Sequence, residues 1–225
     1  MVNRGVYIMK EPKTYTVMRG TLDFLFRVLF RPTIEGVENI PEDGRVILAG
    51  NHTHFMDCIS VAAATKRCVH FLAKSELMKP PLKWFFAPFG IIPVHRGQKD
   101  KAALQSAIEV LEDDKVIGIF PEGKVNNETG TLLPLKFGAV KMASVTNSRI
   151  VPFVITGKYR FFRKKIHIKF FEPVTVSENL EEANNMLWNV INDNLQREIK
   201  LLDKSVYKLF INQISHFDIL RCFLL

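Results

Sequence analysis

The chain has 225 residues, of which 47% are hydrophobic and 24% are charged, and its formal net charge is +8. This length and composition predict one globular domain and exclude an intrinsically disordered chain. The three cysteines, Cys58, Cys68 and Cys222, are scattered and form no C-x-x-C pair. They therefore argue against a disulfide framework and a zinc knuckle, and they favour a reducing compartment.

The positive charge favours a polyanionic partner, such as an anionic membrane, a phosphorylated ligand or a nucleic acid. Nucleic acid is the weakest of these, because no helix-turn-helix, zinc-finger or RRM signature accompanies the charge. The first fifteen residues mix charges with Pro12, so we expect no secretory signal. No stretch reaches the roughly 18–20 apolar residues of a transmembrane helix, so we expect the chain to lie on a membrane without crossing it.

The first predicted element is an amphipathic helix over residues 15–30. Its apolar residues recur at helical spacing with basic residues at their margins: Phe24, Leu25, Val28 and Leu29, with Arg19 and Arg27. Such a helix can lie in the headgroup layer of a membrane or pack as an ordinary core helix, and the sequence leaves both open. Residues 34–41 then predict a short edge strand that runs into a turn at 42–44.

From residue 46 onward, predicted strands and helices alternate. Strands are expected at 46–49, 70–73, 91–94, 116–120, 150–155 and, as an outer strand, 165–171, and helices at 57–66, 83–86, 100–112 and 134–145. Ser177 is expected to cap a long helix from about 178 to 203. This order predicts a single α/β domain with a mostly parallel central sheet flanked by helices, preceded by the amphipathic N-terminal segment.

Three segments follow from these elements. Residues 1–32 form a membrane-associating amphipathic segment, residues 33–203 form the globular domain, and residues 204–225 form an apolar tail. The tail can pack on the core or touch lipid, and the sequence does not choose between them.

The segment NHTHFMD at 51–57 follows the first buried strand. His52 and Asp57 lie five positions apart, an offset that brings two side chains together neither on one helix nor on one strand. They can meet only if the chain turns between them, with His52 leaving a strand and Asp57 entering a helix. A carboxylate that holds an imidazole in one tautomer makes histidine a general base. Taken alone, the motif also fits a polar loop with one structural histidine.

Three further polar clusters fall at the carboxyl ends of predicted strands, where open α/β sheets bind ligands. Arg96 follows the strand at 91–94 and offers a guanidinium for bidentate phosphate binding. Glu122 follows a strand that is buried on both faces, where carboxylates are seldom left unpaired, and Gly123 lets the backbone approach a ligand. Pro152 suits a strand start and is expected to shape the pocket wall.

The blocks NHTHFMD, FLAKSEL, GIIPVHRG, FPEGK and IVPFVI, in this order, resemble those of the glycerolipid acyltransferases, most closely the bacterial 1-acylglycerol-3-phosphate O-acyltransferases. The match spans residues 47–157, about half of the chain. The resemblance implies transfer of a fatty acyl group from a thioester of coenzyme A or acyl carrier protein to the free hydroxyl of 1-acylglycerol 3-phosphate, which gives phosphatidic acid. Glycerol 3-phosphate or another lysophospholipid is the alternative acceptor. The thioester is a co-substrate, and no further cofactor or metal is implied.

By position, the resemblance makes His52 the catalytic base and Asp57 its partner. It also makes Lys74 a cation that neutralises charge near the thioester. His54 lies outside the family pattern, and we interpret it as a polar pocket or packing residue. Cys58 adjoins Asp57, and we interpret it as a small buried hydrophobe in preference to a nucleophile.

The resemblance assigns Arg96, Glu122 and Gly123 to the binding of the phosphorylated acceptor, and Pro152 to a block that is more structural than chemical. One departure concerns the block that reads F-P-E-G-T-R-S in the family. Here Lys124-Val125-Asn126 follows the glycine, so Lys124 replaces the phosphate-binding arginine one place early, as a point charge. This departure affects the identity of the acceptor more than the type of reaction.

Two readings of other classes compete with this one. A zinc hydrolase with an H-x-H-x-D-H box would need aspartate where Met56 stands and a histidine after Asp57. A non-catalytic membrane-binding module would not need the dyad. The basic aromatic runs at 15–31 and 78–89 predict a peripheral protein on the anionic, cytoplasmic face of the cell membrane.

Overall fold

The computed structural model describes residues 13–81, 90–94, 100–126, 128, 130–163 and 165–222, with side chains from Arg19 to Leu202. The helix expected at 83–86, most of the aromatic run at 78–89, and Arg96 lie outside the described residues.

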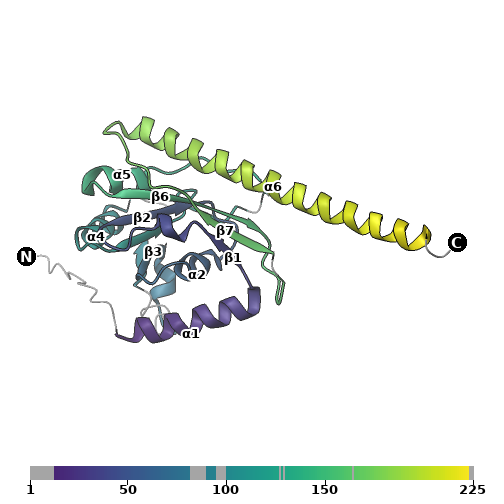
Figure 1. The fold of residues 1–225 in the computed structure, drawn as a ribbon. Coiled ribbons are helices and arrows are strands. Elements are labelled where there is room, and N and C mark those ends of the chain that lie inside the picture. Colours follow the sequence, from purple (N-terminus) through teal and green to yellow (C-terminus); the bar gives the residue numbers. More distant parts are fainter. Residues whose placement is uncertain are drawn as a thin grey trace, which may run out of the picture.

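Within the described part of the chain, seven strands form one sheet in the order β1-β7-β6-β2-β5-β3-β4 (Figure 1). Neighbouring strands are parallel except β6 and β7, so the mostly parallel sheet is confirmed. The strand expected as the outer one is β7, and β1 covers its free side. The strands are β1 (Thr33–Glu35), β2 (Val46–Gly50), β3 (Val69–Lys74), β4 (Ile92–Val94), β5 (Val116–Ile119), β6 (Arg149–Gly157) and β7 (Ile166–Phe170).

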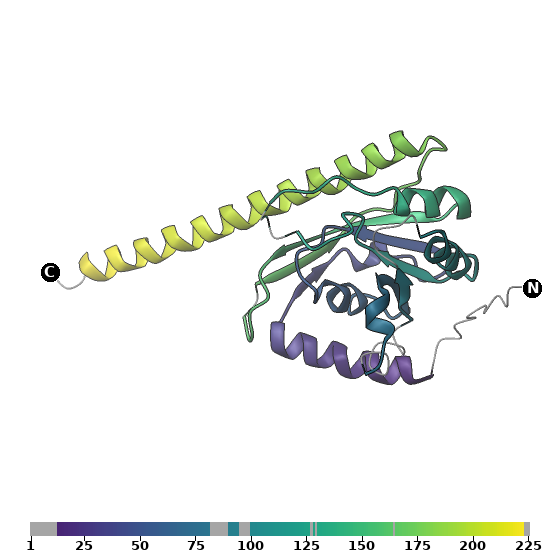
Figure 2. The ribbon, with the colours of Figure 1, turned by 180° about the vertical axis from the view of Figure 1, so that it is seen from behind.

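Helices cover both faces of the sheet. They are α1 (Lys13–Phe30), α2 (Asp57–Ala62), α4 (Lys101–Glu112), α5 (Gly138–Thr146) and α6 (Leu180–Cys222), with 3-10 turns η1 (Val37–Asn39) and η2 (Ser75–Met78). Figures 1 and 2 show α4, α5 and α6 on one face, and α2 with α1 beneath it on the other. Alternate residues of β2 enter different cores: Ile47 and Ala49 face α4, α5 and α6, whereas Val46 and Leu48 face α2. This double coverage explains why β2 is apolar without interruption.

The helix expected at 15–30 is confirmed as α1, and it has two apolar faces. Phe26 and Phe30 are buried against Ala63, the residue that follows α2. Of the four residues singled out from the sequence, Phe24, Leu25 and Val28 point outward and are exposed at 65%, 44% and 46%. The fourth, Leu29, is half-buried and packs on the same cluster as Phe26 and Phe30. The helix therefore packs on the domain and also presents an apolar surface. Within the described residues, no helix has both the length and the apolar character needed to cross a bilayer.

The long C-terminal helix differs from expectation at both ends. The expected cap, Ser177, is wrong, because Asn179 Oδ1 accepts the backbone N–H groups of Glu181 at 3.1 Å and Glu182 at 3.3 Å. Ser177 Oγ instead donates to the Asn179 carbonyl, which delays the helix by two residues. The helix does not stop near 203 but continues to Cys222 as one element, and its second half projects beyond the sheet (Figures 1 and 2).

Two other boundaries moved for local reasons. The helix expected at 134–145 begins only at Gly138, because the Lys136 N–H donates to the Pro121 carbonyl at 2.8 Å and holds the preceding residues as a loop. Pro152 lies inside β6 and not at its start. Its carbonyl accepts the Phe171 N–H at 2.9 Å. An N–H group at this position would point toward β7, as the Pro152 carbonyl does. The β6–β7 pairing ends at Phe153, so the missing N–H costs no hydrogen bond of the sheet.

The capping geometry gives a stability prediction. Asn179→Ala removes the acceptor of two orphan N–H groups, and we expect it to lower the free energy of unfolding by about 1 kcal/mol. Ser177→Ala is the matched control and should leave stability unchanged, as measured by urea unfolding of both variants. Equal effects of the two substitutions would contradict the assignment of the cap.

Candidate active site

The parallel strands bring the predicted residues to one edge of the sheet. β2, β5 and β3 run in the same direction, so His52, Glu122 and Lys74 all lie at or just past carboxyl ends. This edge is where open α/β sheets hold their ligands.

The predicted meeting of His52 and Asp57 is confirmed. His52 leaves β2, the chain turns at residues 55–56, and Asp57 begins α2. His52 Nδ1 lies 3.0 Å from Asp57 Oδ2. A carboxylate at this distance accepts a hydrogen bond from Nδ1–H, which keeps the proton on Nδ1 and leaves Nε2 as the proton acceptor of the neutral ring. The ring also stacks on Phe120 with centroids 4.2 Å apart, which fixes its plane.

Asp57 is fully buried, and its carboxylate is held by donors from two segments, the turn after β2 and the turn after β6. Oδ2 accepts the backbone N–H groups of Thr53 at 2.6 Å and His54 at 2.8 Å, in addition to His52. Oδ1 accepts the hydroxyl of Tyr159 at 2.7 Å. These donors offset the cost of burying a charge, and they fix the orientation of the carboxylate toward His52.

Tyr159 was not expected from the sequence. It follows the end of β6, and its hydroxyl lies 2.7 Å from Ser60 Oγ as well as from Asp57. Burial and the neighbouring Asp57 charge raise the pKa of Tyr159 far above its ordinary value, so the phenol stays protonated and remains a donor. No motif marks this residue, because it meets Asp57 only through the tertiary fold.

His54 is the packing residue expected from the sequence, whereas Cys58, expected to be buried, is half-buried against the core beside α2. His54 stacks on Tyr159 with centroids 4.8 Å apart, and its Nδ1 accepts the Met56 N–H at 3.3 Å. Burial, together with the charge of Asp57, raises the pKa of Cys58 to about 12. The thiolate needed for a nucleophile is therefore absent at neutral pH.

The backbone of His52 is clamped on both sides. Its N–H donates to Glu122 Oε1 at 2.8 Å, and its carbonyl accepts the Asn126 N–H at 2.7 Å. Glu122 is buried, and its Oε2 accepts the Leu133 N–H at 3.0 Å and Asn126 Nδ2 at 3.1 Å. The prediction that Glu122 is not left unpaired is confirmed. Its hydrogen bonds run to His52, Asn126 and Leu133 of the protein itself.

Asn51, the residue before His52, ties the end of β2 to β6. Its side chain accepts the Ile155 N–H at 2.8 Å and donates to the Ile155 carbonyl at 2.9 Å. The amide thus continues the β2–β6 pairing one residue past the end of β2, and this anchors the point at which the chain turns away.

Gly123 adopts a φ of 71°, in the left-handed region. A Cβ built there would lie 2.6 Å from Lys136 Nζ, so a side chain would meet both backbone strain and a collision. Lys136 therefore lies directly over this loop, whereas Lys124 is exposed beside it.

Two predicted site residues lie farther from the dyad. Extending the strand registers places Lys74 level with Asn51, but two strands away from β2. Alternation along β3 puts it on the α4 face of the sheet, opposite to Phe120, and no hydrogen bond or ion pair of the described residues joins it to His52 or Asp57. Pro152 is buried behind the site.

A cavity of about 470 Å³ opens beside His52. Pro152 is not among the described residues that line it; residues 155–159, farther along the same strand and its turn, take that place. One buried lining group, Thr156 Oγ1, has no hydrogen-bond partner among the described residues. The lining residues are Asn51, His52, Thr53, His54, Glu122, Asn126, Glu128, Gly130, Thr131, Ile155, Thr156, Gly157, Lys158, Tyr159, Leu195, Ile199 and Leu202.

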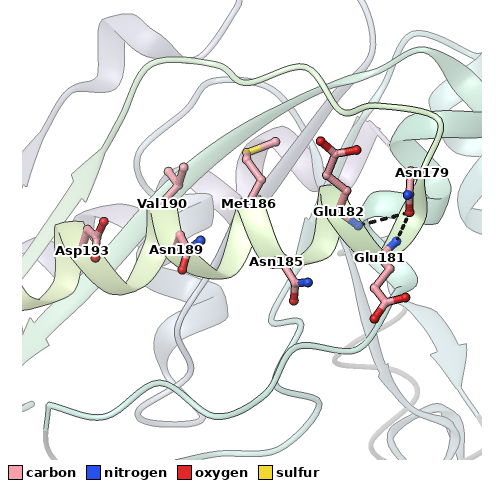
Figure 3. A pocket seen from close by; sticks show the side chains of 8 residues that line it. All are labelled: Asn179, Glu181, Glu182, Asn185, Met186, Asn189, Val190 and Asp193. Atoms are coloured by element: carbon pink, nitrogen blue, oxygen red, sulfur yellow. Dashed lines mark hydrogen bonds between the residues drawn. The ribbon is translucent and has the colours of Figure 1, made fainter.

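A second hollow, of about 580 Å³, lies along the first turns of α6. Figure 3 shows that its residues run along one side of that helix and its cap without converging on a point. It contains no arrangement suited to catalysis. Across the described residues, no three His, Cys, Asp or Glu side chains gather in a way that could hold a metal ion.

The sequence matches the family model described as Acyltransferase over residues 31–156. This chain belongs to the acyltransferase family. The matched region includes the His52–Asp57 dyad and Glu122. The resemblance seen in the sequence is thereby confirmed, and the protein is an O-acyltransferase.

Relatives agree with this assignment. A 1-acyl-sn-glycerol-3-phosphate acyltransferase of Borreliella burgdorferi is 30% identical over 181 residues, which cover 75% of this chain and 72% of the relative. One from Bacillus subtilis is 26% identical over 180 residues, which cover 76% and 88%. The crystal structure of the acyltransferase PlsC from Thermotoga maritima superposes with a TM-score of 0.67 at 25% identity, covering 86% of this chain and 84% of that one.

The contact between Tyr159 and Asp57 predicts a kinetic effect. Tyr159→Phe removes a hydrogen bond to a buried carboxylate, so we expect a stability loss of about 1.5–3 kcal/mol and a fall of about tenfold in kcat with unchanged KM. Ser60→Ala is the control, since it removes the other neighbour of the phenol, and the Ser60 bond to the Met56 carbonyl, but keeps the contact between Tyr159 and Asp57. A Tyr159→Phe enzyme with parental kcat would show that the phenol does not orient the dyad.

Proposed function

We propose that this acyltransferase moves a fatty acyl group from a thioester of coenzyme A or acyl carrier protein to the free hydroxyl of 1-acylglycerol 3-phosphate, giving phosphatidic acid. The observation that carries the proposal is the His52–Asp57 contact at 3.0 Å beside a cavity. The names of the relatives support the choice of acceptor. No cofactor besides the thioester co-substrate is proposed.

In the proposed mechanism, His52 Nε2 removes the proton of the acceptor hydroxyl as that oxygen attacks the thioester carbonyl carbon. The resulting tetrahedral oxyanion collapses and expels the thiolate, which takes the proton from Nε2. Asp57 stabilises the imidazolium in between. General base catalysis of this kind contributes ~10²–10⁴-fold, and alignment of the two substrates contributes further.

The oxyanion needs a hydrogen-bond donor or a cation, and the structure reduces the number of candidate groups. The N–H groups of Thr53 and His54 are already donated to Asp57, so they are engaged in the ground state. Lys74 remains a proposed cation for this purpose, although it lies on another strand. The unpaired hydroxyl of Thr156 lines the same cavity as His52, and we propose it as a second donor toward the substrates.

Cations at this edge suit the phosphate of the acceptor. Arg96 follows β4 by two residues, and we propose it as the bidentate phosphate ligand, assisted by Lys124. Lys158 is a cation that lines the described cavity. Glu122 and Gly123 are proposed to act on acceptor binding by holding this loop and the His52 backbone in place. Because Lys124-Val125-Asn126 departs from the family pattern, glycerol 3-phosphate and other lysophospholipids are worth testing as acceptors.

We also propose that the protein is peripheral, on the cytoplasmic face of the cell membrane. The outward face of α1, with Phe24, Leu25 and Val28, and the net charge of +8 support contact with an anionic bilayer.

His52→Ala should lower kcat by ~10²–10⁴-fold while leaving the fold intact, because it removes the proposed base. His54→Ala is the control: it removes a neighbouring imidazole whose ring makes no hydrogen bond to Asp57. The His54→Ala enzyme should keep most of the activity. Both variants are assayed for acyl transfer, with circular dichroism as the folding check. A folded His52→Ala enzyme at near-parental rate would refute the base assignment and favour a non-catalytic membrane module.

Arg96→Ala should raise KM for the phosphorylated acceptor by about tenfold or more with a smaller change in kcat, since it removes a charge-assisted contact. Arg45→Ala is the matched control, because Arg45 pairs with Asp114 at the amino ends of the strands. The KM and kcat of both variants are measured by steady-state kinetics with one acceptor that carries a phosphate and one that lacks it. An equal loss with both acceptors would count against the phosphate contact.

A further inference from the structure

The turn between β6 and β7 presents two phenylalanines to solvent. Phe161 and Phe162 are each 65% exposed. We define the hairpin tip as residues 158–163 and 165, which the Lys158 N–H closes by donating to the Lys165 carbonyl at 3.0 Å. Figures 1 and 2 show the hairpin reaching past the sheet on the α1 side, next to the C-terminal end of that helix.

Phe162 has an unfavourable backbone conformation for its side-chain type, and its ring is not part of the core. Its φ is 58°, in the left-handed region that favours glycine and is unusual for a bulky side chain. Because the Phe162 side chain is also exposed, packing within the free protein contributes little free energy to offset this backbone strain. Its exposed position is explained if the ring is buried in a partner.

The tip is strongly basic. No acidic residue occurs in the sequence between Glu128 and Glu172. Among the described residues, no ion pair neutralises the tip's basic side chains, Lys158, Arg160, Arg163 and Lys165. Aromatic rings flanked by unpaired cations match the boundary between the acyl chains and the headgroups of an anionic membrane.

The tip is joined to α1. The Phe162 N–H donates to the Leu29 carbonyl, and the Phe161 ring stacks on Phe30 with centroids 5.1 Å apart. The exposed side chains of α1, Phe24, Leu25 and Val28, belong to the same helix. The tip therefore lies beside the C-terminal end of the helix that carries these exposed residues.

We propose that the hairpin tip inserts Phe161 and Phe162 into an anionic lipid bilayer, with its arginines on the headgroup phosphates, as a membrane contact separate from α1. Tyr159 belongs to this tip and donates to Asp57, so insertion brings the dyad to the headgroup layer. The inference rests on the proposed function in one respect: a lysolipid acceptor would be met at that layer. An acidic carrier protein would suit the cations but would leave the two rings without a partner.

Phe162→Gly tests the ring without harming the fold, because glycine adopts this φ freely. Arg160→Glu/Arg163→Glu tests the charge. The matched controls lie on the opposite face of the sheet: Phe137→Ala at the start of α5, where the ring is 48% exposed, and Lys101→Glu/Lys141→Glu on α4 and α5. All variants are sedimented with phosphatidylcholine vesicles with and without phosphatidylglycerol.

We expect both tip variants to weaken binding to the phosphatidylglycerol vesicles, the charge reversal by about tenfold or more, with melting temperatures and controls near parental. Parental vesicle binding by both tip variants would overturn the proposal. Parental vesicle binding together with a raised KM for acyl carrier protein thioester would overturn it in favour of a protein-docking surface.

An activity assay separates this inference from the proposed function. With a short-chain lysophosphatidate that is monomeric in water, the tip variants should keep parental kcat, and with acceptor embedded in vesicles they should lose rate. If the parent acylates no lysophosphatidate at all, the proposed acceptor fails, while the sedimentation result still decides the membrane contact. Equal loss with soluble and embedded acceptor would show that the tip acts on the dyad and not on the membrane.

Discussion

The active site depends on one buried carboxylate. Asp57 has no contact with solvent, and its charge is tolerated because donors reach it from the turn after β2, from His52 and from Tyr159. These contacts also set the direction of the imidazole. The same hydrogen bonds that offset desolvation thus hold the His52 ring in one defined tautomer, so the stability of the fold and the proposed chemistry share one set of interactions.

The sheet supplies the frame for this arrangement. β2 lies between β5 and β6, and each neighbour holds a different part of the His52 segment: Glu122 after β5 takes its N–H, and Ile155 of β6 takes the Asn51 amide. A histidine on an unsupported turn would sample many orientations. Here its backbone is fixed from both sides, which is the preorganisation that general base catalysis needs.

Much of this could be predicted from the sequence, since β–α alternation gives the parallel sheet and an offset of five forces a turn between His52 and Asp57. Three features could not. The cap moved from Ser177 to Asn179 because two neighbouring side chains competed for the same turn. The outward face of α1 was indistinguishable from its core face by spacing alone. Tyr159 reaches Asp57 across 102 positions, and it lies three residues past the region that matches the family.

That long-range contact has a consequence for the order of events during folding. A chain synthesised only as far as Glu122, just past β5, would already hold His52 and Asp57, yet Asp57 would lack the phenol and Asn51 would lack Ile155. Catalytic competence therefore arrives with the docking of β6 and the turn that follows it. The dyad is encoded early in the chain but is completed late, so a nascent or truncated polypeptide carries the motif without a finished site.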